Sequence, residues 1–575
     1  MKKFLILFIS SLFLLQLFGQ ETLKSYEENY YDMLSLTGES SRNYINYRTL
    51  SNSIWKTTEA ENLPWEPKNL GSVYSFTPFR KADNWFVNGI NQSFDIKVFA
   101  LDFYNSFNTK APFGQNDSTL WQGRGYNTSL STGFNLKAYG FEATFKPQFT
   151  FSQNLAFDIM KSEKGSEYSV YGYWYGNADA VQRYGDLPVK TFDFGDSEIR
   201  YNFYNFTVGY GTQQIWLGPA VINPLLLSNN AAPFPKFDIG INRTTIKIPG
   251  LNWYLGDIEL HSWVGKLKES DFFDNDSSND FNQYSGFSIA WALPYLKGLT
   301  IGFNKICICN WGDAYWLKYL NPFFSNNTIH TSDEENISGE DQKASLTIDW
   351  VLEPAGFEFY SEIGVDDYLS KGLVFYEYAR FPFHTMTFTV GLKKALNINP
   401  EKRIRGVINF EWNSTEGSRD YYNWGGTSYN FGFHHQIKQG YTNKGQWLGS
   451  GIGYGGNSQY LDFTLYSPHG YDKFFIFRNN PDNNYVNYKI NMGVSAGDRE
   501  GRWFTAYKAN FVIGAETLWF IHNDLSVKGG MLYNLIINPL YNPGYTGTSK
   551  NGYKVYRDYT YWNNFQFNLE LKYNL

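Results

Sequence analysis

The chain ends with Phe565-Gln566-Phe567-Asn568-Leu569-Glu570-Leu571-Lys572-Tyr573-Asn574-Leu575, in which six apolar residues alternate with five polar ones. Alternation at period two is typical of a strand with one apolar and one polar face. A last amphipathic strand that pairs with the first strand of its sheet leaves no free edge. Transmembrane barrels of the bacterial outer membrane close in this way, so the chain end predicts a β-barrel.

The same alternation recurs upstream, where Gly, Asn, Asp and Pro separate the alternating runs. Each run is expected to form a strand. The clearest runs cover residues 94–100, 141–145, 287–293, 346–352, 386–392 and 486–494. A soluble β-sandwich shows the same pattern, so alternation alone does not place the apolar face in lipid.

The composition of the 575-residue chain limits the fold class. Aromatic residues make up 19% of it, and the mean hydropathy is -0.43. A bundle of membrane-spanning helices is excluded, because each helix would need about 20 consecutive apolar residues. Disorder is excluded by the aromatic content and by the small net charge of -6. We therefore predict an all-β fold, a large antiparallel transmembrane β-barrel of about 16 to 18 strands. A secreted soluble β-protein is the alternative.

The first residues have the pattern of a targeting segment. Met1-Lys2-Lys3 is basic, residues 4–18 are almost wholly apolar, and Gly19-Gln20 offers a small residue where cleavage is expected. The apolar run is shorter than the roughly 20 residues of a spanning helix. We predict a secretory signal peptide over residues 1–20 and a final location in the cell outer membrane.

Residues 21–70 differ from the rest of the chain. Tyr26, Tyr30 and Met33 fall at helical spacing and predict one short helix over about residues 24–36. We interpret residues 21–70 as an N-terminal periplasmic helical segment and residues 71–575 as the barrel. Such a helix could plug or cap the periplasmic mouth, although an ordinary surface helix would have the same pattern.

The sequence carries no motif for catalysis or for a cofactor. H-E-x-x-H and Walker A patterns are absent. Residues 451–456 match G-x-G-x-x-G, but a strand-like run follows them where dinucleotide binding needs a helix. Cys307 and Cys309 form a C-x-C pair without further Cys or nearby His, which is poor for a metal site. We expect no cofactor and no metal.

Acidic residues supply the remaining enzymatic alternative. Glu340, Asp341, Glu362 and the Asp366-Asp367 pair could provide the two carboxylates of a glycoside hydrolase. Solvated charges in a lumen or loop are favoured, and we predict that the protein is not an enzyme. No basic cluster is present that would indicate nucleic-acid binding.

Two segments have a composition suited to sugars. Residues 116–127 and 216–235 combine Trp and Tyr with Asn, Asp, Gln and Arg, and neither alternates as a strand would. Aromatic faces pack on the C–H patches of sugars, while amide and guanidinium groups bind hydroxyls. Most other Trp and Tyr residues are expected in the interfacial girdles of the barrel.

These segments resemble the capsule assembly Wzi family. The resemblance covers most of the chain, and its motifs occur in order. They are residues 116–125 with 127–131, 182–185 with 197–200, 216–219 with 226–234, 298–304 with 311–312, 339–341 with 359–362, and His435 with 440–445 and 448–449.

The resemblance implies an outer-membrane barrel of about eighteen strands with a helical element on the periplasmic side. It further implies a lectin that holds capsular polysaccharide at the cell surface without enzymatic activity. Two features differ from enterobacterial members: the helical region is short, and Leu217 stands where they favour an aromatic residue. A porin or substrate-specific channel is the alternative function.

Our hypothesis for the site is that loops present five residues to a polysaccharide, with the aromatic rings stacking on it and Arg124 pairing with acidic sugars. These residues are Trp121, Arg124, Trp216, Asn229 and Asn230. The expected partners are the polysaccharide and outer-membrane lipid, and we expect a monomer.

Overall fold

The fold is taken from a computed structural model. It describes residues 23–53, 55–57, 64–65, 72–76, 84–90, 94–162, 166–169, 178–311, 340–366, 380–423, 431–434, 436–495, 505–542, 544–548, 550 and 554–574. The predicted signal peptide lies outside the described residues. Among the described residues, no helix has the length and hydrophobicity needed to cross a membrane.

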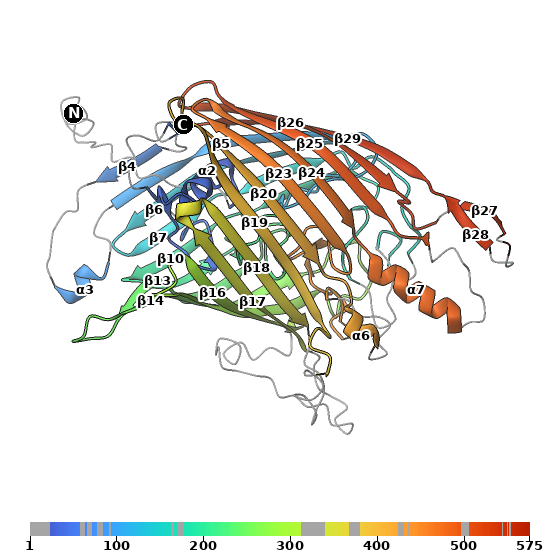
Figure 1. Cartoon of the computed structure of the whole chain (residues 1–575), viewed down its shortest axis with the longest axis horizontal. Helices are drawn as coiled ribbons and strands as arrows, with labels where there is room; N and C mark the ends of the chain where they lie inside the picture. Colours follow the sequence, from blue (N-terminus) through green and yellow to red (C-terminus); the bar gives the residue numbers. More distant parts are fainter. Residues whose placement is uncertain are drawn as a thin grey trace.

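The described strands form a closed antiparallel β-barrel (Figure 1). Its wall runs, in chain order, through β5 (Phe94–Asn108), β6 (Gly125–Ala138), β7 (Phe141–Phe145), β8 (Gln148–Ser152), β9 (Val189–Asp193), β10 (Glu198–Phe203), β11 (Phe206–Gly211), β13 (Lys236–Lys247), β14 (Tyr254–Lys268), β15 (Phe281–Ala292), β16 (Leu299–Asn310), β17 (Glu340–Leu352), β18 (Phe357–Asp366), β19 (Met386–Asn399), β20 (Ile404–Ser414), β23 (Asn457–Ser467), β24 (Gly470–Asn480), β25 (Ala509–Phe520), β26 (Leu525–Ile537) and β29 (Tyr561–Tyr573). A short strand, β4 (Ser72–Phe76), pairs with β5 beside the seam.

The last strand closes the barrel as predicted. β29 pairs with β5 from Gln566 opposite Asn108 to Tyr573 opposite Leu101. The β7–β8 strand is interrupted at Pro147, which has no N–H to donate to the ladder, and β9–β10 is interrupted opposite it. With each interrupted pair counted as one strand, the described wall has 18 strands.

The direction of the side chains decides between a membrane barrel and a soluble sandwich. On β29 the apolar Phe567 is 50% exposed, whereas the polar Lys572 is 2% exposed. A sandwich would bury the apolar face and expose the polar one. Here the apolar face points outward and the polar face lines the lumen, as in a transmembrane barrel.

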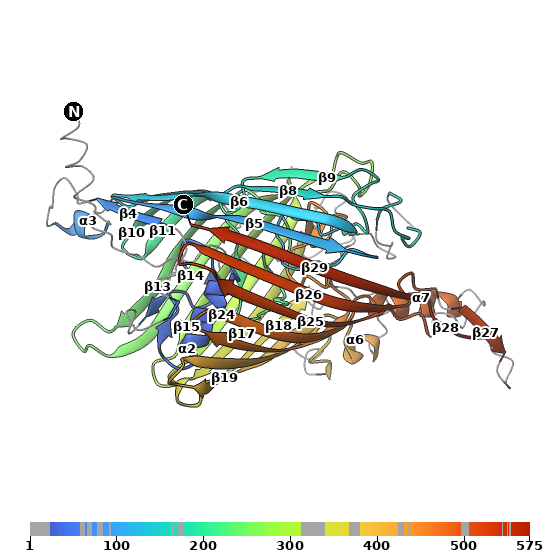
Figure 2. The same ribbon diagram turned by 90° about the horizontal axis from the view of Figure 1, so that it is seen from above.

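The two ends of the barrel differ in their connections. Tight turns such as residues 293–298 and the 3-10 turn η4 (Glu353–Ala355) lie at the end that also holds the C-terminus (Figures 1 and 2). Long connections such as residues 212–235 lie at the other end, where α6 (Arg419–Asn423) and the hairpin β27 (Gly544–Thr548) and β28 (Lys554–Asp558) are seen. In outer-membrane barrels the short turns are periplasmic and the long loops extracellular. A further short helix, α3 (Trp85–Asn88), lies near the periplasmic end.

The predicted N-terminal helix is present as α2 (Tyr26–Ser35) and lies inside the barrel (Figure 2). Ser25 caps it by accepting a hydrogen bond from the Glu28 N–H at 3.2 Å. The helix docks on the wall through an ion pair between Glu27 and Lys572 of 3.0 Å. Two short pairings complete the segment, in which β1 (Ser40–Ser41) meets β3 (Lys56–Thr57) and β2 (Tyr47–Arg48) meets β12 (Trp216–Leu217).

One predicted strand is wrong. Residues 486–494 form part of a helix, α7 (Asn483–Ser495), in the connection between β24 and β25. Its residues Tyr485 and Val486 are buried with Ala506 and Tyr541 of neighbouring loops. This connection is not part of the barrel wall, and in the described residues no adjacent strand pairs with its backbone. In a helix, the N–H and C=O groups of the segment form hydrogen bonds with one another instead.

Candidate functional site

Two segments that enter the barrel from opposite ends meet inside it. The N-terminal segment of residues 23–53 holds α2, which lies inside the barrel (Figure 2), and the long loop of residues 212–235 joins β11 to β13 at the extracellular end and folds inward to meet it. They pair at β2 and β12, and the Gly218 N–H donates to the Asn46 carbonyl at 3.0 Å. An apolar cluster packs around the loop, formed by Leu225, Leu226, Leu227, Trp263, Tyr284, Phe431, Tyr441 and Tyr454 among others. These segments occupy part of the lumen.

Carboxylates of the wall hold the inserted backbone. Glu259 accepts hydrogen bonds from the N–H groups of three successive residues, Ile45, Asn46 and Tyr47, at 2.8, 3.0 and 2.7 Å. Backbone away from a sheet and inside a barrel needs such partners, because an unpaired buried N–H is costly.

The inserted loop is held in the same manner. Glu411 accepts from the N–H groups of Val221, Ile222 and Asn223 at 2.7, 3.1 and 2.7 Å. Glu362 accepts from the Leu225 N–H at 2.8 Å. Three wall carboxylates therefore fix the two inserted segments.

Three of the acidic residues considered for hydrolysis, Glu362, Asp341 and Asp366, are engaged in the interior. Glu362 holds the loop, and Asp341 and Asp366 each lie 2.7 Å from the Lys343 ammonium. Asp367 lies outside the described residues. Among the described residues, no group of three or more His, Cys, Asp or Glu side chains is arranged to hold a metal ion. Cys307 and Cys309 are buried and are not joined in a disulfide.

Trp216 lies between the two inserted segments. Its side chain is 0% exposed. The Lys24 ammonium lies 4.7 Å and the Arg48 guanidinium 5.5 Å from its ring, and its indole N–H donates to the Ala220 carbonyl at 3.0 Å. In this position Trp216 joins the N-terminal segment to the loop.

Asn229, Asn230 and Arg124 connect loops to one another. The Asn229 carbonyl accepts from the Ser118 N–H at 2.8 Å, and the Asn230 amide donates to the Trp447 carbonyl at 2.9 Å. The Arg124 guanidinium donates to the carbonyls of Thr109 and Ala156. Contact of these residues with a polymer stays a prediction.

Trp121 lines a cavity of about 530 Å³ among the extracellular loops, which we call the outer pocket. The structure thus separates Trp121, at a pocket, from Trp216, inside the barrel. Side chains that border the outer pocket include Trp121, Tyr168, Tyr184, Lys268, Glu269, Phe272 and Lys444.

Four of the family-like motifs reach the outer pocket. Trp121 comes from the first, Tyr184 and Gly185 from the second, Ala232 from the third and Lys444 from the last. These segments are far apart in the sequence, and the barrel brings them together. Tyr168, Glu269 and Phe272, which also border the pocket, were not predicted, because no motif or spacing relates them to Trp121.

Aromatic rings form a continuous series along the pocket. The ring of Tyr184 lies 5.0 Å from that of Trp121 and 5.8 Å from that of Phe272, which in turn lies 5.8 Å from Tyr168. Gly185 has a φ of +66°, and a Cβ there would lie 2.5 Å from the Phe272 ring. Glycine is therefore required for this approach.

Polar groups around the rings are mostly engaged. The Tyr184 hydroxyl donates to the Lys444 carbonyl at 2.7 Å, and the Tyr168 hydroxyl donates to Asp186 at 3.0 Å. Glu269 differs, since it is 3% exposed and its Oε1 has no hydrogen-bond partner among the described residues. Burial and the nearby carboxylates, Asp274 foremost, raise the pKa of Glu269 to about 9.

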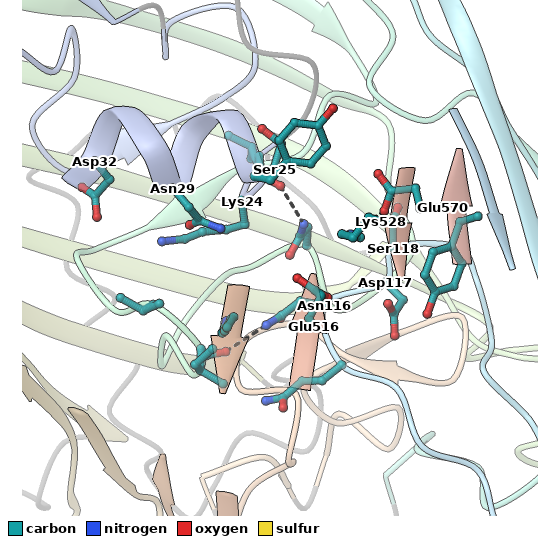
Figure 3. Close-up of a pocket in the computed structure, with 18 of the residues that line it drawn as sticks. Lys24, Ser25, Asn29, Asp32, Asn116, Asp117, Ser118, Glu516, Lys528 and Glu570 are labelled. Atoms are coloured by element: carbon teal, nitrogen blue, oxygen red, sulfur yellow. Dashed lines mark hydrogen bonds and ion pairs between the residues drawn. The ribbon is translucent and has the colours of Figure 1, made fainter. Parts of the chain in front are cut away.

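A second cavity of about 480 Å³ lies beside α2 within the barrel (Figure 3). Figure 3 shows Lys24 and Ser25 of the N-terminal segment on one side, with Asp117 and Lys528 on the other. Burial raises the pKa of Asp117 to about 7. Its lining combines acids and bases, so it is a polar space beside the inserted segments.

Comparisons with known proteins agree with this architecture. A family model described as "Capsule assembly protein Wzi" matches residues 114–550, which is more than half of the chain. No curated protein matches the sequence.

Among solved structures, an Escherichia coli protein is described as Wzi, an outer membrane protein involved in group 1 capsule assembly and a carbohydrate-binding β-barrel. It is 13% identical with a TM-score of 0.52, over 83% of this chain and 85% of that chain, and this likeness shows the fold. OprB of Pseudomonas putida is 9% identical with a TM-score of 0.35, over 83% and 94% of the two chains. OprD of Pseudomonas aeruginosa is 8% identical with a TM-score of 0.36, over 86% and 98%. The last two scores are too low to carry an argument.

Proposed function

The chain belongs to the capsule assembly protein Wzi family and resides in the outer membrane, and from this premise we propose that it binds a surface polysaccharide at the outer pocket. By holding the polymer there, it would attach the capsular or extracellular polysaccharide to the cell. The proposal includes no catalytic step.

The convergence of four family motifs on the outer pocket carries the proposal. Motifs that served only the barrel would be expected along its wall, yet these meet beside Trp121 and Tyr184 at the extracellular end. The solved E. coli relative is described as carbohydrate binding, which agrees with a sugar-binding role for the same family.

The chemistry of the pocket suits a sugar. Trp121, Tyr184 and Phe272 are partly exposed and border the pocket, where they offer apolar surface to sugar C–H groups, and carboxyl and ammonium groups lie beside them. One pocket binds weakly, but a polymer with repeated units engages many copies of the protein on one cell, and the contacts add by avidity.

We assign different roles to the five predicted site residues. Trp121 touches the polymer. Trp216, Asn229, Asn230 and Arg124 hold the inserted loop and the pocket loops in place, in keeping with their internal partners.

A diffusion channel is the competing function. The inserted segments and their apolar cluster argue against a wide pore. The alternative predicts a steady open conductance in planar bilayers and no retention of polysaccharide.

The test combines bilayer conductance with a pull-down of polysaccharide from the cells that make the protein. Wild type is expected to stay closed and to retain polymer, and Trp121→Ala to lose about tenfold or more in retention. Trp253→Ala is the matched control, because Trp253 is exposed at a periplasmic turn. Equal retention by the two folded variants would remove Trp121 from the site.

A further inference from the structure

We propose that the outer pocket accepts an uncharged sugar residue and rejects uronic acid residues and other anionic sugars. This inference rests on the proposed function, because it assigns the substrate class of the same pocket. It replaces the earlier hypothesis that Arg124 pairs with acidic sugars.

Two of the three lysines that border the pocket already have partners. Lys444 lies 2.7 Å from Asp193, and Lys268 lies 3.5 Å from Asp271. Lys190 also borders the pocket, but it belongs to the outward face of β9. Arg124 donates to two backbone carbonyls. An incoming carboxylate would therefore have to share Lys444 or Lys268 with a carboxylate that already lies beside it, and that carboxylate would repel it.

The inner part of the pocket is acidic. Glu269 is buried with one unpartnered oxygen. Its own loop contributes Asp274, Asp276 and Asp280, and the loop between β8 and β9 contributes Asp179. Lys438, which is half-exposed, lies 3.9 Å from Asp276. A sugar carboxylate placed here would be repelled by several like charges.

An uncharged sugar meets complementary groups instead. With its pKa raised to about 9, Glu269 carries a proton at neutral pH and can both donate to and accept from a sugar hydroxyl. The rings of Trp121, Tyr184 and Phe272 bind the C–H face without any charge. Without a sugar hydroxyl in the pocket, the buried Oε1 of Glu269 has no hydrogen-bond partner among the described residues. A site of this kind discriminates strongly against ligands that lack the hydroxyl.

The first experiment uses polysaccharide from the cells that make the protein, separated by anion exchange into an uncharged and an acidic pool. A portion of the acidic pool is carboxyl-reduced, which converts uronic acids to neutral sugars. Wild-type protein is expected to retain the uncharged pool and the reduced pool at least tenfold better than the unreduced acidic pool. Tighter retention of the acidic pool overturns the inference and leaves the proposed function intact. Retention of no pool by folded protein overturns both.

The second experiment tests Glu269 itself. Retention of the uncharged pool by wild type is expected to fall as the pH rises through about 9, since Glu269 then ionises. In Glu269→Gln, which keeps a donor and an acceptor but cannot ionise, retention is expected to be pH-independent over that range. Glu269→Leu is expected to lose about tenfold at neutral pH. A wild-type profile that matches Glu269→Gln would show that Glu269 does not contact the sugar.

The third experiment changes the repelling charges. Asp274→Asn with Asp276→Asn is expected to raise retention of the acidic pool several-fold and to leave the uncharged pool unaffected. Both residues lie in an extracellular loop, and the fold of each variant is checked by its gel shift on heating. No gain for the acidic pool would contradict the assigned basis of the rejection.

Discussion

Arg48 lies opposite Trp216 in a two-residue antiparallel pairing, and its guanidinium lies 5.5 Å from the indole ring. Arg48 also forms a 2.7 Å ion pair with Glu28. This pair is one of the contacts that join the segment from the periplasmic end to the loop from the extracellular end.

Replacement of Arg48 should open the lumen. Arg48→Ala leaves Glu28 buried without its counter-ion, and loss of one partner of a buried pair costs about 3 kcal/mol or more. We expect a lower unfolding temperature and new current steps in planar bilayers. Lys56→Ala, an exposed lysine of the same segment, is the control and should remain closed. A closed Arg48→Ala barrel would show that the junction does not seal the lumen.

Replacement of Glu411 should destabilise the inserted loop. Its carboxylate accepts from three successive N–H groups of the inserted loop, and Glu411→Gln keeps only one accepting oxygen. We expect a loss of about 2 kcal/mol in stability and weaker polysaccharide retention, because the loop also borders the outer pocket. Thermal unfolding and the pull-down measure both effects. Glu401→Gln, at an exposed turn, should change neither.

Gly185→Ala should damage the pocket without harm to the barrel. The added Cβ would lie 2.5 Å from the Phe272 ring, so the ring must move away from Tyr184. We expect reduced retention of polysaccharide. The control is Gly250→Ala, where φ is also positive at +84° and no atom lies within 4 Å of the added Cβ. Equal retention by the two variants would show that the position of Phe272 does not matter.

Lys24 should make stability depend on pH. Burial foremost, with the nearby Arg48 next, lowers the pKa of Lys24 to about 7, so the unfolded chain binds this proton more tightly than the folded one. The resulting penalty is complete below about pH 7 and disappears as the pH rises toward the ordinary lysine value of 10.5. Stability should therefore increase over this window. Urea titrations of Lys24→Met should show a higher stability at pH 7 and no such increase, whereas Lys56→Met should behave as wild type.

The barrel could be predicted from the sequence because alternate side chains of a strand point to opposite faces, so that apolar residues facing lipid alternate with polar residues facing the lumen. β5, β15, β17, β19 and β29 lie where that pattern placed them. The helix near residues 24–36 was predicted from its apolar spacing for the same local reason. Residues 486–494 show the limit of this reasoning, since alternating apolar residues formed a helix once the chain had left the wall.

The site was predictable only in part. The motifs around Trp121, Tyr184 and Lys444 were found as separate segments, but their meeting depends on loops that cross between strands. The burial of Trp216 could not be predicted, because it depends on a pairing with Arg48 across 168 positions of the chain, the difference of their numbers. Glu269 gave no signal, since its behaviour comes from acids that fold around it.

The ion pair between Glu27 and Lys572 connects the first helix to the last strand, 545 residues apart in the chain. Glu27 is synthesised long before Lys572, so this ion pair can form only after the last strand has been made. A chain cut short before β29 leaves the Glu27 carboxylate without this counter-ion, and it also lacks the strand that seals the wall. Enclosure of the helix and closure of the seam therefore belong to one late event of assembly, and only a full-length chain can complete it.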